Sequence, residues 1–324
     1  NNLYGWAMSQ PLPNDSFEWV PEAEWQNIDW CAQTADQETG YFVECDLDYP
    51  DHLHDSHSDY PLAPERLSVK THMLSDAQHE QLAVYNTKQA SLKISKLVPN
   101  LFAKHNYTCH YMNLRFYLEH GLVLTKVHRV IRFHQSRWLA AYIATNSELR
   151  ANARNEFEKD FYKLMNNAVY GKTCENVLKR QDIRLITDGR KAKKLINKPH
   201  CTGFRIFTED IAAVAVQKIT AKIGKPTYVG LAVLEYAKLH MYNFHYNQAM
   251  KHGPDGRLRL ILTDTDSLFY EIQTDDAYAD MQSNPELREW FDTSNYSHDH
   301  PLCSATNKMV IGKMKDEAAG KIMY

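Results

Sequence analysis

Apolar and polar positions recur along the chain with two periods, and these periods predict both strands and helices. Residues 40–50, GYFVECDLDYP, combine β-type residues with turn formers at both ends and predict a strand. Residues 111–133 alternate polar and apolar positions around a glycine, which predicts a hairpin. Residues 76–90 and 134–150 have helical character, and residues 51–65 read as a loop. The first half therefore mixes both element types, and we find no internal repeat.

A longer helix is predicted over residues 155–177. Asn155 is its expected N-cap, acidic residues fill its first turn, and Gly171 is expected to end it. One face of this helix is apolar, and we expect that face to pack on the core. The residues of this stripe are Phe157, Phe161, Leu164 and Ala168.

The second half begins with a basic segment, residues 178–210, that reads as strands and loops. Residues 226–252 predict a long helix with Pro226 near its first turn, ended by the Gly-Pro pair that follows. Residues 257–272, RLRLILTDTDSLFYEI, predict a strand, a tight turn and a second strand. Three large aromatic residues are expected in the core, namely Trp138, Tyr236 and Tyr242. The first residues, NNLYG, show no cap that would start a helix.

Composition allows one large domain or two to three modest ones in 324 residues. No apolar run approaches the roughly 18 residues of a membrane span, and no signal-peptide layout opens the chain, so no membrane association is expected. Six cysteines lie scattered without a C-x-x-C pair, which argues against a zinc site or a disulfide framework. This pattern favours a reducing, intracellular location, nuclear or cytoplasmic.

Charge is unevenly distributed along the chain. Residues 1–65 hold 14 of the 40 acidic residues and none of the 37 basic ones, so the remainder carries 37 basic against 26 acidic side chains. A basic body of this kind often binds polyanions, although a solvated surface explains the charge equally well.

The sharpest candidate for chemistry is LTDTDS, residues 262–267. Apolar strand-like runs flank Asp264 and Asp266, and two residues at this spacing project to the same side of an extended backbone. Close like charges are costly unless a cation lies between them. Mg²⁺ is the natural candidate, because it takes oxygen ligands and leaves positions open for phosphates. A hairpin turn without a metal is the alternative.

A second candidate lies on the helix predicted over residues 155–177. Lys163, Asn167 and Tyr170 are spaced i, i+4 and i+7, so they share one face. A lysine could meet a phosphate, a tyrosine could pack against a sugar or base, and Gly171 would permit close approach. An ordinary amphipathic surface helix would show the same spacing. Together with a cation-binding hairpin, however, this row suits metal-assisted phosphoryl or nucleotidyl transfer.

These motifs resemble those of family B DNA polymerases. KLMNNAVYGK, residues 163–172, is similar to motif B, LTDTDS is similar to motif C, and NNLYG, residues 1–5, is similar to the tail of motif A. Residues 41–65, 111–143 and 307–317 resemble the protein-primed branch, in the form found in Maverick/Polinton mobile elements and related viruses. The resemblance covers essentially the whole chain.

The resemblance implies roles for individual residues. Asp264 and Asp266 match the catalytic metal ligands, with Asp266 as the more direct one, and two Mg²⁺ ions are implied. Lys163 matches the lysine that contacts the incoming triphosphate. Asn167, Tyr170 and Gly171 match the nucleotide pocket of motif B, and Tyr4 matches the tyrosine that excludes a 2′-hydroxyl.

Some positions depart from the family pattern. The aspartate of motif A would stand three residues before Asn2 and five before Tyr4, which places it just ahead of this sequence. Gly5 stands where a proline is common, and Ala168 where many relatives carry serine. Where a basic residue often precedes motif B the chain has alanine, and Arg150 or Arg154 are the candidates to replace it.

The expected fold class is α+β, a polymerase palm of antiparallel sheet backed by helices, with helical fingers and inserted subdomains. The LTDTDS hairpin would be central in the palm sheet, over the helix of residues 226–252. The expected division is palm for 1–11, 118–150 and 223–324, a terminal-protein-region-1-like insertion for 12–117, fingers for 151–177, and a second, basic insertion for 178–222. Exonuclease and thumb domains would lie outside the chain.

The expected activity is template-directed addition of a deoxynucleotide to a primer 3′-hydroxyl or a priming protein, by a fragment that lacks one metal-ligand carboxylate. Template and primer DNA, dNTP and a terminal protein would be the partners. DNA would also contact the basic run after motif B. Its candidate residues are Lys179, Arg180, Arg190, Lys191, Lys193 and Lys194.

Two alternatives remain open on the sequence. One is an inactive, DNA-binding remnant of a mobile-element polymerase. The other is a different metal-dependent enzyme that uses the D-T-D motif, such as a nuclease or a glycosyltransferase. A separate transition-metal site is a further alternative for the acidic and histidine-rich stretch of residues 51–59.

Overall fold

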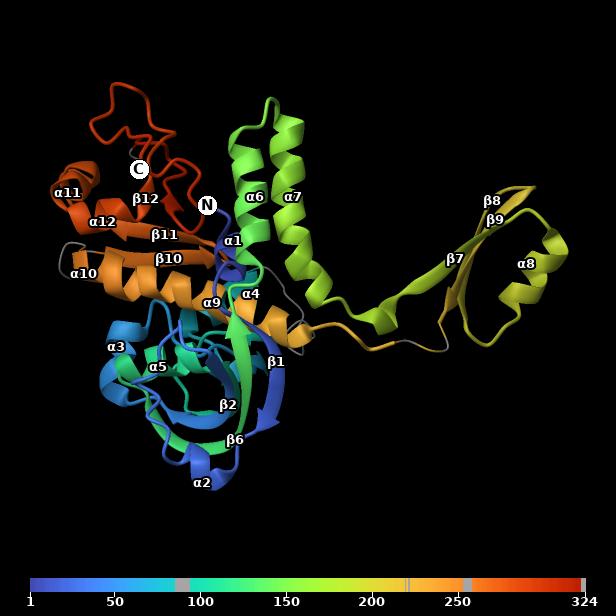
Figure 1. Ribbon diagram of the computed structural model, residues 1–324, viewed down its shortest axis with the longest axis horizontal. Helices are drawn as coiled ribbons and strands as arrows, with labels where there is room; N and C mark the ends of the chain where they lie inside the picture. The colour runs from blue at the N-terminus through green and yellow to red at the C-terminus, as the bar shows by residue number, and fades with distance from the viewer. Residues whose placement is uncertain (85–93, 219, 221, 253–257, 322–324) are drawn as a thin grey trace. The chain divides into compact units, whose positions relative to one another are not determined.

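The structure is a computed structural model that describes residues 1–84, 94–218, 220, 222–252 and 258–321 (Figure 1). It is mixed α/β, and all but one of its strand pairs are antiparallel. The chain divides into two compact units. We call residues 1–167 with 231–324 the first unit and residues 168–230 the second unit. Within the described ranges, no helix has both the length and the apolar character required to cross a bilayer.

The helices and strands follow one another closely. The α-helices are α1 (Leu3–Met8), α2 (Glu22–Trp25), α3 (His54–His57), α4 (Asp76–Val84), α5 (Tyr111–Glu119), α6 (Ala140–Ala151), α7 (Glu156–Thr173), α8 (Gly189–Ile196), α9 (Thr227–Phe244), α10 (Met250–His252), α11 (Ala277–Ser283) and α12 (Pro285–Glu289). Short 3-10 turns are η1 (Asp51–Leu53), η2 (Thr71–Met73) and η4 (Val177–Lys179), and η5 (His245–Ala249) is a π-helix. The strands are β1 (Leu12–Trp19), β2 (Thr39–Asp48), β3 (Glu65–Ser68), β4 (Ser95–Val98), β5 (Lys104–His110), β6 (Val123–Ser136), β7 (Gln181–Ile186), β8 (Cys201–Thr208), β9 (Ile211–Gln217), β10 (Leu258–Asp264), β11 (Ser267–Ile272), β12 (Phe291–Asp292) and β13 (Met314–Lys315).

The largest sheet has the strand order β1-β6-β2-β5 and lies in the first unit. The 14-residue strand β6 pairs with both β1 and β2, and Tyr41 lies opposite Arg132 in the β2–β6 pairing. Apolar residues of β2, β5 and α5 form the core beside this sheet. The expected strand at 40–50 is thus confirmed as β2, and the helices expected near 76–90 and 134–150 are found as α4 and α6. The part of 76–90 after Val84 lies outside the described residues.

The predicted hairpin over residues 111–133 is wrong. Its first half is α5, and only its second half is strand, the start of β6. Tyr111, Leu114 and Tyr117 are each fully buried, and this spacing of three is the face of a helix. Gly121 does make the break, at φ +92°, but it separates a helix from a strand. The expected loop at 51–65 likewise contains η1 and α3.

The acidic N-terminal segment is partly paired with basic side chains of β6 and the turn after it. Six of its carboxylates lie within ion-pair distance of the basic side chains of residues 128–137. Arg132, for example, binds Glu18 at 2.8 Å and Glu24 at 3.0 Å. Exposed pairs contribute little stability each, about 0–1 kcal/mol. Their effect is that the acidic segment offers less net charge to a partner than its composition indicates.

The second unit contains a three-stranded sheet with the order β7-β9-β8 and helix α8 packed on one face. The segment expected as strands and loops over 178–210 therefore also contains a helix, capped by Asp188. This unit holds 13 basic and 5 acidic residues. The remaining chain has 24 basic and 35 acidic residues, so the excess of positive charge belongs to the second unit.

The long helix predicted over 226–252 is confirmed as α9, which continues through η5 into α10. Tyr236 and Tyr242 are buried as expected, whereas Trp138 is 47% exposed, so its expected place in the core is wrong. The Gly-Pro pair expected to end the helix lies outside the described residues. In the π-helix, His245 Nδ1 lies 2.9 Å from the Tyr270 hydroxyl of β11, so this helix supports the hairpin.

The β10–β11 hairpin is found where 257–272 predicted it, but its expected central place in a larger antiparallel sheet is wrong. In the described chain, the two strands form a sheet of their own. The expected domain boundaries are not tested by this arrangement and stay a prediction. Strands from both sides of the expected boundary at 117/118 share the four-stranded sheet, and the second unit extends beyond residues 178–222 on both sides.

Three buried histidines make stability depend on pH. Burial lowers the pKa of His57 to about 4, of His110 to about 3 and of His245 to about 4, from an ordinary value of 6.5. The unfolded chain therefore binds more protons once the pH falls below 6.5. We expect the free energy of unfolding to be highest above pH 6.5. It should fall by roughly 1.4 kcal/mol per histidine for each pH unit toward 4. Urea unfolding midpoints at pH 7.5, 5.5 and 4.5 measure this.

His110→Phe is the informative variant. Neither ring nitrogen of His110 has a hydrogen-bond partner among the described residues, so an apolar ring of similar size removes the titration without breaking a hydrogen bond. The variant should lose less stability than the parent between pH 6.5 and 4.5. A pH dependence identical to that of the parent would contradict this assignment.

Candidate metal and nucleotide site

The tip of the β10–β11 hairpin carries the two candidate metal ligands. Asp264 is the last residue of β10, and Asp266 lies in the two-residue turn. Thr265 between them has φ +51°, a left-handed conformation that non-glycine residues seldom adopt. The Asp266 amide donates to the Asp264 carbonyl at 2.5 Å, and both aspartates are exposed. The expected extended backbone between them is therefore wrong, because a sharp turn orients Asp266 separately from Asp264.

Side chains from the N-terminal half hold this hairpin. The Leu260 amide donates to Asp59 Oδ2 at 3.0 Å, next to a register shift in the hairpin. The side chain of Tyr60 makes a hydrogen bond with Thr263, three residues further along β10. Asp59 therefore has a structural role, and it belongs to the stretch 51–59 considered above for a transition metal.

The transition-metal alternative for residues 51–59 is not supported. His57 is buried, with Nδ1 2.8 Å from the Tyr49 hydroxyl, and His54 Nε2 lies 3.2 Å from the Tyr49 carbonyl oxygen. Among the residues that the structure describes, no group of three or more histidine, cysteine or acidic side chains could hold a metal ion. His54 and His57 instead bind Tyr49 and fix the local chain.

The motif NNLYG forms the start of a helix, contrary to the expectation that it contains no cap. Asn2 adopts φ +48° and its side chain accepts a hydrogen bond from the Gly5 amide at 3.3 Å, which caps α1. Tyr4 lies in the first turn of α1 and is partly buried. Helix α1 contacts α6 within the first unit.

Asn1 is attached to the C-terminal part of the first unit. Its amino group donates to the Lys313 carbonyl at 2.7 Å, and its carbonyl accepts from the Gly312 amide at 2.8 Å. Its side-chain amide donates to Asp292 Oδ2 at 2.6 Å. Gly312 has φ +82°, and a Cβ there would lie 2.3 Å from the Trp6 ring of α1, so only glycine fits. No periodic pattern predicts this attachment, which joins residues more than 300 positions apart.

Charged groups converge on the Asn1 amino group. Burial lowers its pKa, Asp266 and then Asp292 act to raise it, and Lys315 and Arg150 act to lower it further. Asp266 is therefore close enough to Asn1 to interact electrostatically, and so is Arg150 of α6. The hairpin tip, the start of the NNLYG motif and a cationic side chain thus share one neighbourhood within the first unit.

Helix α7 runs antiparallel to α6 and carries the predicted nucleotide-contacting row. Two hydrogen bonds join these helices: the Asn166 side chain donates to Ser147 Oγ at 3.5 Å, and the Tyr142 hydroxyl donates to the Met165 carbonyl at 3.2 Å. Lys163 is exposed and makes no ion pair with another described residue. The Nε of Arg150 is buried without a hydrogen-bond partner in the described chain. Arg150, a candidate in the sequence for the basic residue ahead of motif B, lies within electrostatic reach of the Asn1 amino group.

The helix prediction for 155–177 is confirmed, including the Asn155 cap, whose side chain accepts from the Glu158 amide at 2.9 Å. Lys163, Asn167 and Tyr170 therefore lie on one helical face. The division between the units falls within α7, so Lys163 and Asn167 belong to the first unit, and Tyr170 and Gly171 to the second.

Two expectations for α7 are wrong. The helix does not end at Gly171 but continues to Thr173, because the hydrogen-bonding pattern of the helix tolerates an internal glycine. The apolar stripe does not pack on the core: Phe157 is 78% exposed and Leu164 62% exposed. The buried positions are instead polar, chiefly Asn166, which contacts α6.

The two hairpin carboxylates suit a Mg²⁺ site that is completed by other ligands. Mg²⁺ is commonly bound by one or two carboxylates, with waters and substrate phosphates in the other positions. Asp264 and Asp266 offer exposed oxygens, and Asp264 Oδ1 accepts one hydrogen bond, from Thr265 at 3.3 Å. Two carboxylates without a third ligand predict weak metal binding by the described residues alone.

The basic residues of the second unit fall into two groups. Arg180 binds Glu175 at 2.6 Å, and Lys172 and Lys225 bind the same carboxylate at 3.3 and 3.2 Å. These hydrogen bonds, those from Arg180 and Lys225 first, hold the pKa of Glu175 far below its usual range. The side chains of the other predicted DNA-contacting residues are exposed and make no ion pair within the described chain. These unpaired residues are Lys179, Arg190, Lys191, Lys193 and Lys194.

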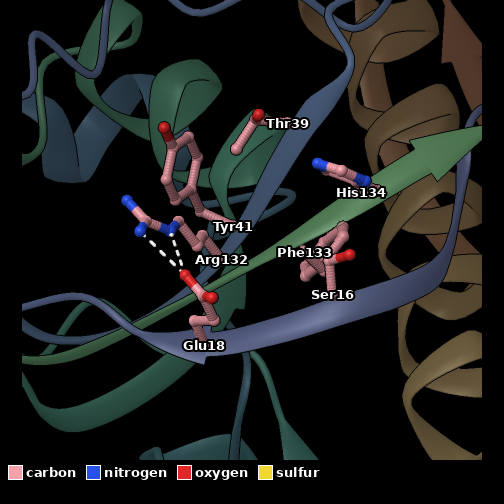
Figure 2. A pocket seen from close by; sticks show the side chains of 7 residues that line it. All are labelled: Ser16, Glu18, Thr39, Tyr41, Arg132, Phe133 and His134. Carbon is pink, nitrogen blue, oxygen red and sulfur yellow. Dashed lines mark hydrogen bonds and ion pairs between the residues drawn. The ribbon is translucent and has the colours of Figure 1, made fainter.

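A separate pocket of about 420 Å³ lies on the four-stranded sheet, away from the predicted site residues (Figure 2). Arg132 crosses this pocket, and its Nε and Nη2 both bind Glu18. Tyr41 and Phe133 supply its aromatic lining. Its one cationic side chain is thus already neutralised, and none of the predicted catalytic or nucleotide-binding residues lines it.

Comparison with known proteins gives structural likeness only. No protein-family model matches the chain, and no curated protein matches it. Similar solved structures are those of Phi29 DNA polymerase. An orthorhombic crystal form is 14% identical, with 86% of this chain and 38% of that chain covered at a TM-score of 0.45. A ternary complex with primer-template DNA and incoming nucleotide substrates is 15% identical, with the same coverage and a TM-score of 0.44. A complex with single-stranded DNA is 14% identical, with 90% of this chain and 39% of that chain covered and a TM-score of 0.45. The chain thus spans about two fifths of those polymerase chains, and likeness at this level does not establish a family.

Gly171→Ala tests whether this glycine serves the fold or a ligand. A Cβ at this position would meet no atom within 4 Å, and glycine inside a helix costs about 0.5–1 kcal/mol relative to alanine. We expect the variant to be more stable by up to that amount in urea unfolding. A loss of stability would show that the fold itself requires glycine, and would remove the argument that Gly171 leaves room for a ligand.

Proposed function

We propose that this chain is the palm-and-fingers portion of a template-directed DNA polymerase of the protein-primed kind. The observation that carries the proposal is the placement of Asn1 close to Asp266. The tail of the motif A-like sequence and the tip of the motif C-like hairpin come together, although they are separated by more than 260 residues. The resemblance to the Maverick/Polinton form of these enzymes remains part of this proposal and rests on the sequence motifs.

The chemistry follows from the side chains around this point. Bound Mg²⁺ would supply charge neutralisation for the triphosphate and the attacking 3′-hydroxyl. Asp264 and Asp266 would hold that metal, and Lys163 and Arg150 would neutralise the phosphates from the helix pair. Tyr4 would lie against the sugar and disfavour a 2′-hydroxyl.

The motif B residues of the nucleotide pocket continue along α7. Asn167, Tyr170 and Gly171 would line it, with Tyr170 beside the nascent base pair. The palm would comprise residues 1–11, 118–150 and 223–324, and the fingers 151–177. DNA would contact the unpaired basic residues of the second unit, and a terminal protein would supply the first hydroxyl.

Primer extension with an N-terminally extended chain tests the proposal. The extension should place an aspartate three residues before Asn2, and its matched control should place asparagine there. We expect Mg²⁺-dependent dNTP addition from the aspartate form and a loss of about 100-fold or more in the control, because a metal ligand supplies several kcal/mol of charge stabilisation. Asp264→Asn and Asp266→Asn should cause losses of similar size. The unextended chain should be nearly inactive.

Lys163→Ala in the active form separates the proposal from its alternatives. Losing one charge-assisted phosphate contact should lower kcat/KM for dNTP by about 10- to 150-fold. A glycosyltransferase would not need Lys163, and a nuclease would degrade the primer without dNTP. Full activity of the unextended chain, or no activity from the aspartate form while DNA still binds, would overturn the proposal. The latter result would favour the DNA-binding remnant.

The unpaired basic residues of α8 should dominate DNA binding by the second unit. Replacing both Lys193 and Lys194 by alanine should reduce the slope of log K against log salt by about 1.8, since each phosphate contact contributes about 0.9. Fluorescence anisotropy with a primed template at several salt concentrations measures this slope.

Arg184→Ala is the matched control, because Arg184 is an equally exposed cation of the same unit whose guanidinium binds Asp182 at 2.8 Å. It should change the slope by less than a single α8 lysine does. Equal effects of the paired and unpaired residues would show that ion pairing within the unit does not select the DNA contacts.

A further inference from the structure

Asp292 is a buried carboxylate at the end of β12 that receives hydrogen bonds from three separate segments. Its Oδ2 accepts from the Asn1 side chain at 2.6 Å and from the Met309 amide at 3.0 Å, and its Oδ1 accepts from the Ser294 amide at 3.0 Å. Its side chain is 1% exposed. Burial alone would raise the pKa of Asp292, but these hydrogen bonds hold the pKa below its usual value, so the group is ionised at neutral pH.

The segments that meet at Asp292 are those that place Asn1. Met309 begins the turn that leads to Gly312 and Lys313, and these two residues pair with the Asn1 backbone at 2.8 and 2.7 Å. His240 of α9 binds the same turn, with Nε2 2.7 Å from the Gly312 carbonyl oxygen. Asp292 therefore organises the turn and also binds the side chain of Asn1 that the turn receives.

We propose that Asp292 is a positioning residue that holds the motif A-like segment against the tip of the β10–β11 hairpin. The inference rests on the function proposed above, since it concerns the residues around Asp264 and Asp266. Asp292 does not need to touch metal or nucleotide for this role. It acts through Asn1, whose side-chain amide donates to Asp292 and whose carbonyl accepts from Gly312, and neither contact requires a free amino group.

No sequence motif marks Asp292, which lies in an ordinary acidic and polar context, EWFDTSN. Its role follows only from the buried hydrogen bonds across 291 positions of chain. A single buried carboxylate with three donors is costly to disturb, because removing one partner leaves polar groups unsatisfied.

Hydrogen exchange in the unextended chain tests the positioning without any activity measurement. The Gly312 amide donates to the Asn1 carbonyl, so its exchange rate reports whether Asn1 is docked. We expect Asn1→Ala, which removes one hydrogen bond to Asp292 and leaves Ser294 and Met309 in place, to accelerate exchange at Gly312 by about 10-fold. Asp292→Asn should cause at least the same acceleration.

Asp316→Asn is the matched control. Asp316 is also a turn-organising carboxylate near the C-terminus, and it accepts from the Ala318 and Gly320 amides at 2.8 and 2.9 Å without contacting Asn1. It should accelerate exchange at Gly320 and leave Gly312 unchanged. If Asp292→Asn does not fold by circular dichroism, Asn1→Ala still decides the question. Unchanged exchange at Gly312 in a folded Asn1→Ala chain would overturn the proposal.

The second readout is the magnesium dependence of the extended, aspartate-bearing chain. Asn1→Ala should raise the Mg²⁺ concentration required for half-maximal rate and lower the rate at saturating Mg²⁺. The first change should be about 10-fold larger than the second. A purely structural role would lower the rate in proportion to the folded fraction and leave the Mg²⁺ concentration for half-maximal rate unchanged, and that result would overturn the positioning role. If the extended chain shows no activity at all, the proposed function fails while the exchange experiment still stands on its own.

Discussion

The attachment of Asn1 to the segment around Gly312 is the constraint on which the candidate site depends. Three hydrogen bonds join the first residue to Asp292 and to the Gly312–Lys313 backbone, and Trp6 covers a glycine that has no room for a side chain. Without this attachment, the C-terminal part of the first unit would no longer hold the start of α1. Tyr4 would then have no defined position relative to the hairpin. Long-range closure of this kind costs chain entropy, so it requires several cooperating contacts.

The folded structure, and not position along the chain, decides which charged side chains are paired. The acidic first 65 residues look like a separate anionic segment in the sequence, yet β6 supplies the cations that pair with much of it. The excess of positive charge resides in the second unit, where Glu175 binds three cations and the basic side chains of α8 make no ion pair with another described residue. The basic residues that are paired within a unit must therefore be left out when its composition is used to predict polyanion binding.

Much of the local structure could be predicted from the sequence, because α7, α9 and the β10–β11 hairpin have strong periodic patterns and clear boundaries. The failures have physical reasons. Residues 111–119 have few helix-specific signals beyond the spacing of their buried tyrosines. The polar and apolar alternation that follows in β6 therefore predicts strand for both segments. The stripe of Phe157 and Leu164 has helical spacing, but spacing alone cannot tell which face of α7 is buried. Asp59 and Asp292 act through hydrogen bonds to residues 201 and 291 positions away, and no local pattern records such contacts.

The turn at Thr265 gives the hairpin a property that an extended D-x-D segment would not have. In a flat strand both carboxylates would face one side at a fixed separation, and both would repel each other at every stage of metal binding. The left-handed residue instead lets Asp264 stay in the strand while Asp266 lies in the turn, within electrostatic reach of Asn1. Each carboxylate can then be paired with a different additional ligand. The hairpin therefore presents its two carboxylates from two different backbone positions, the end of β10 and the turn.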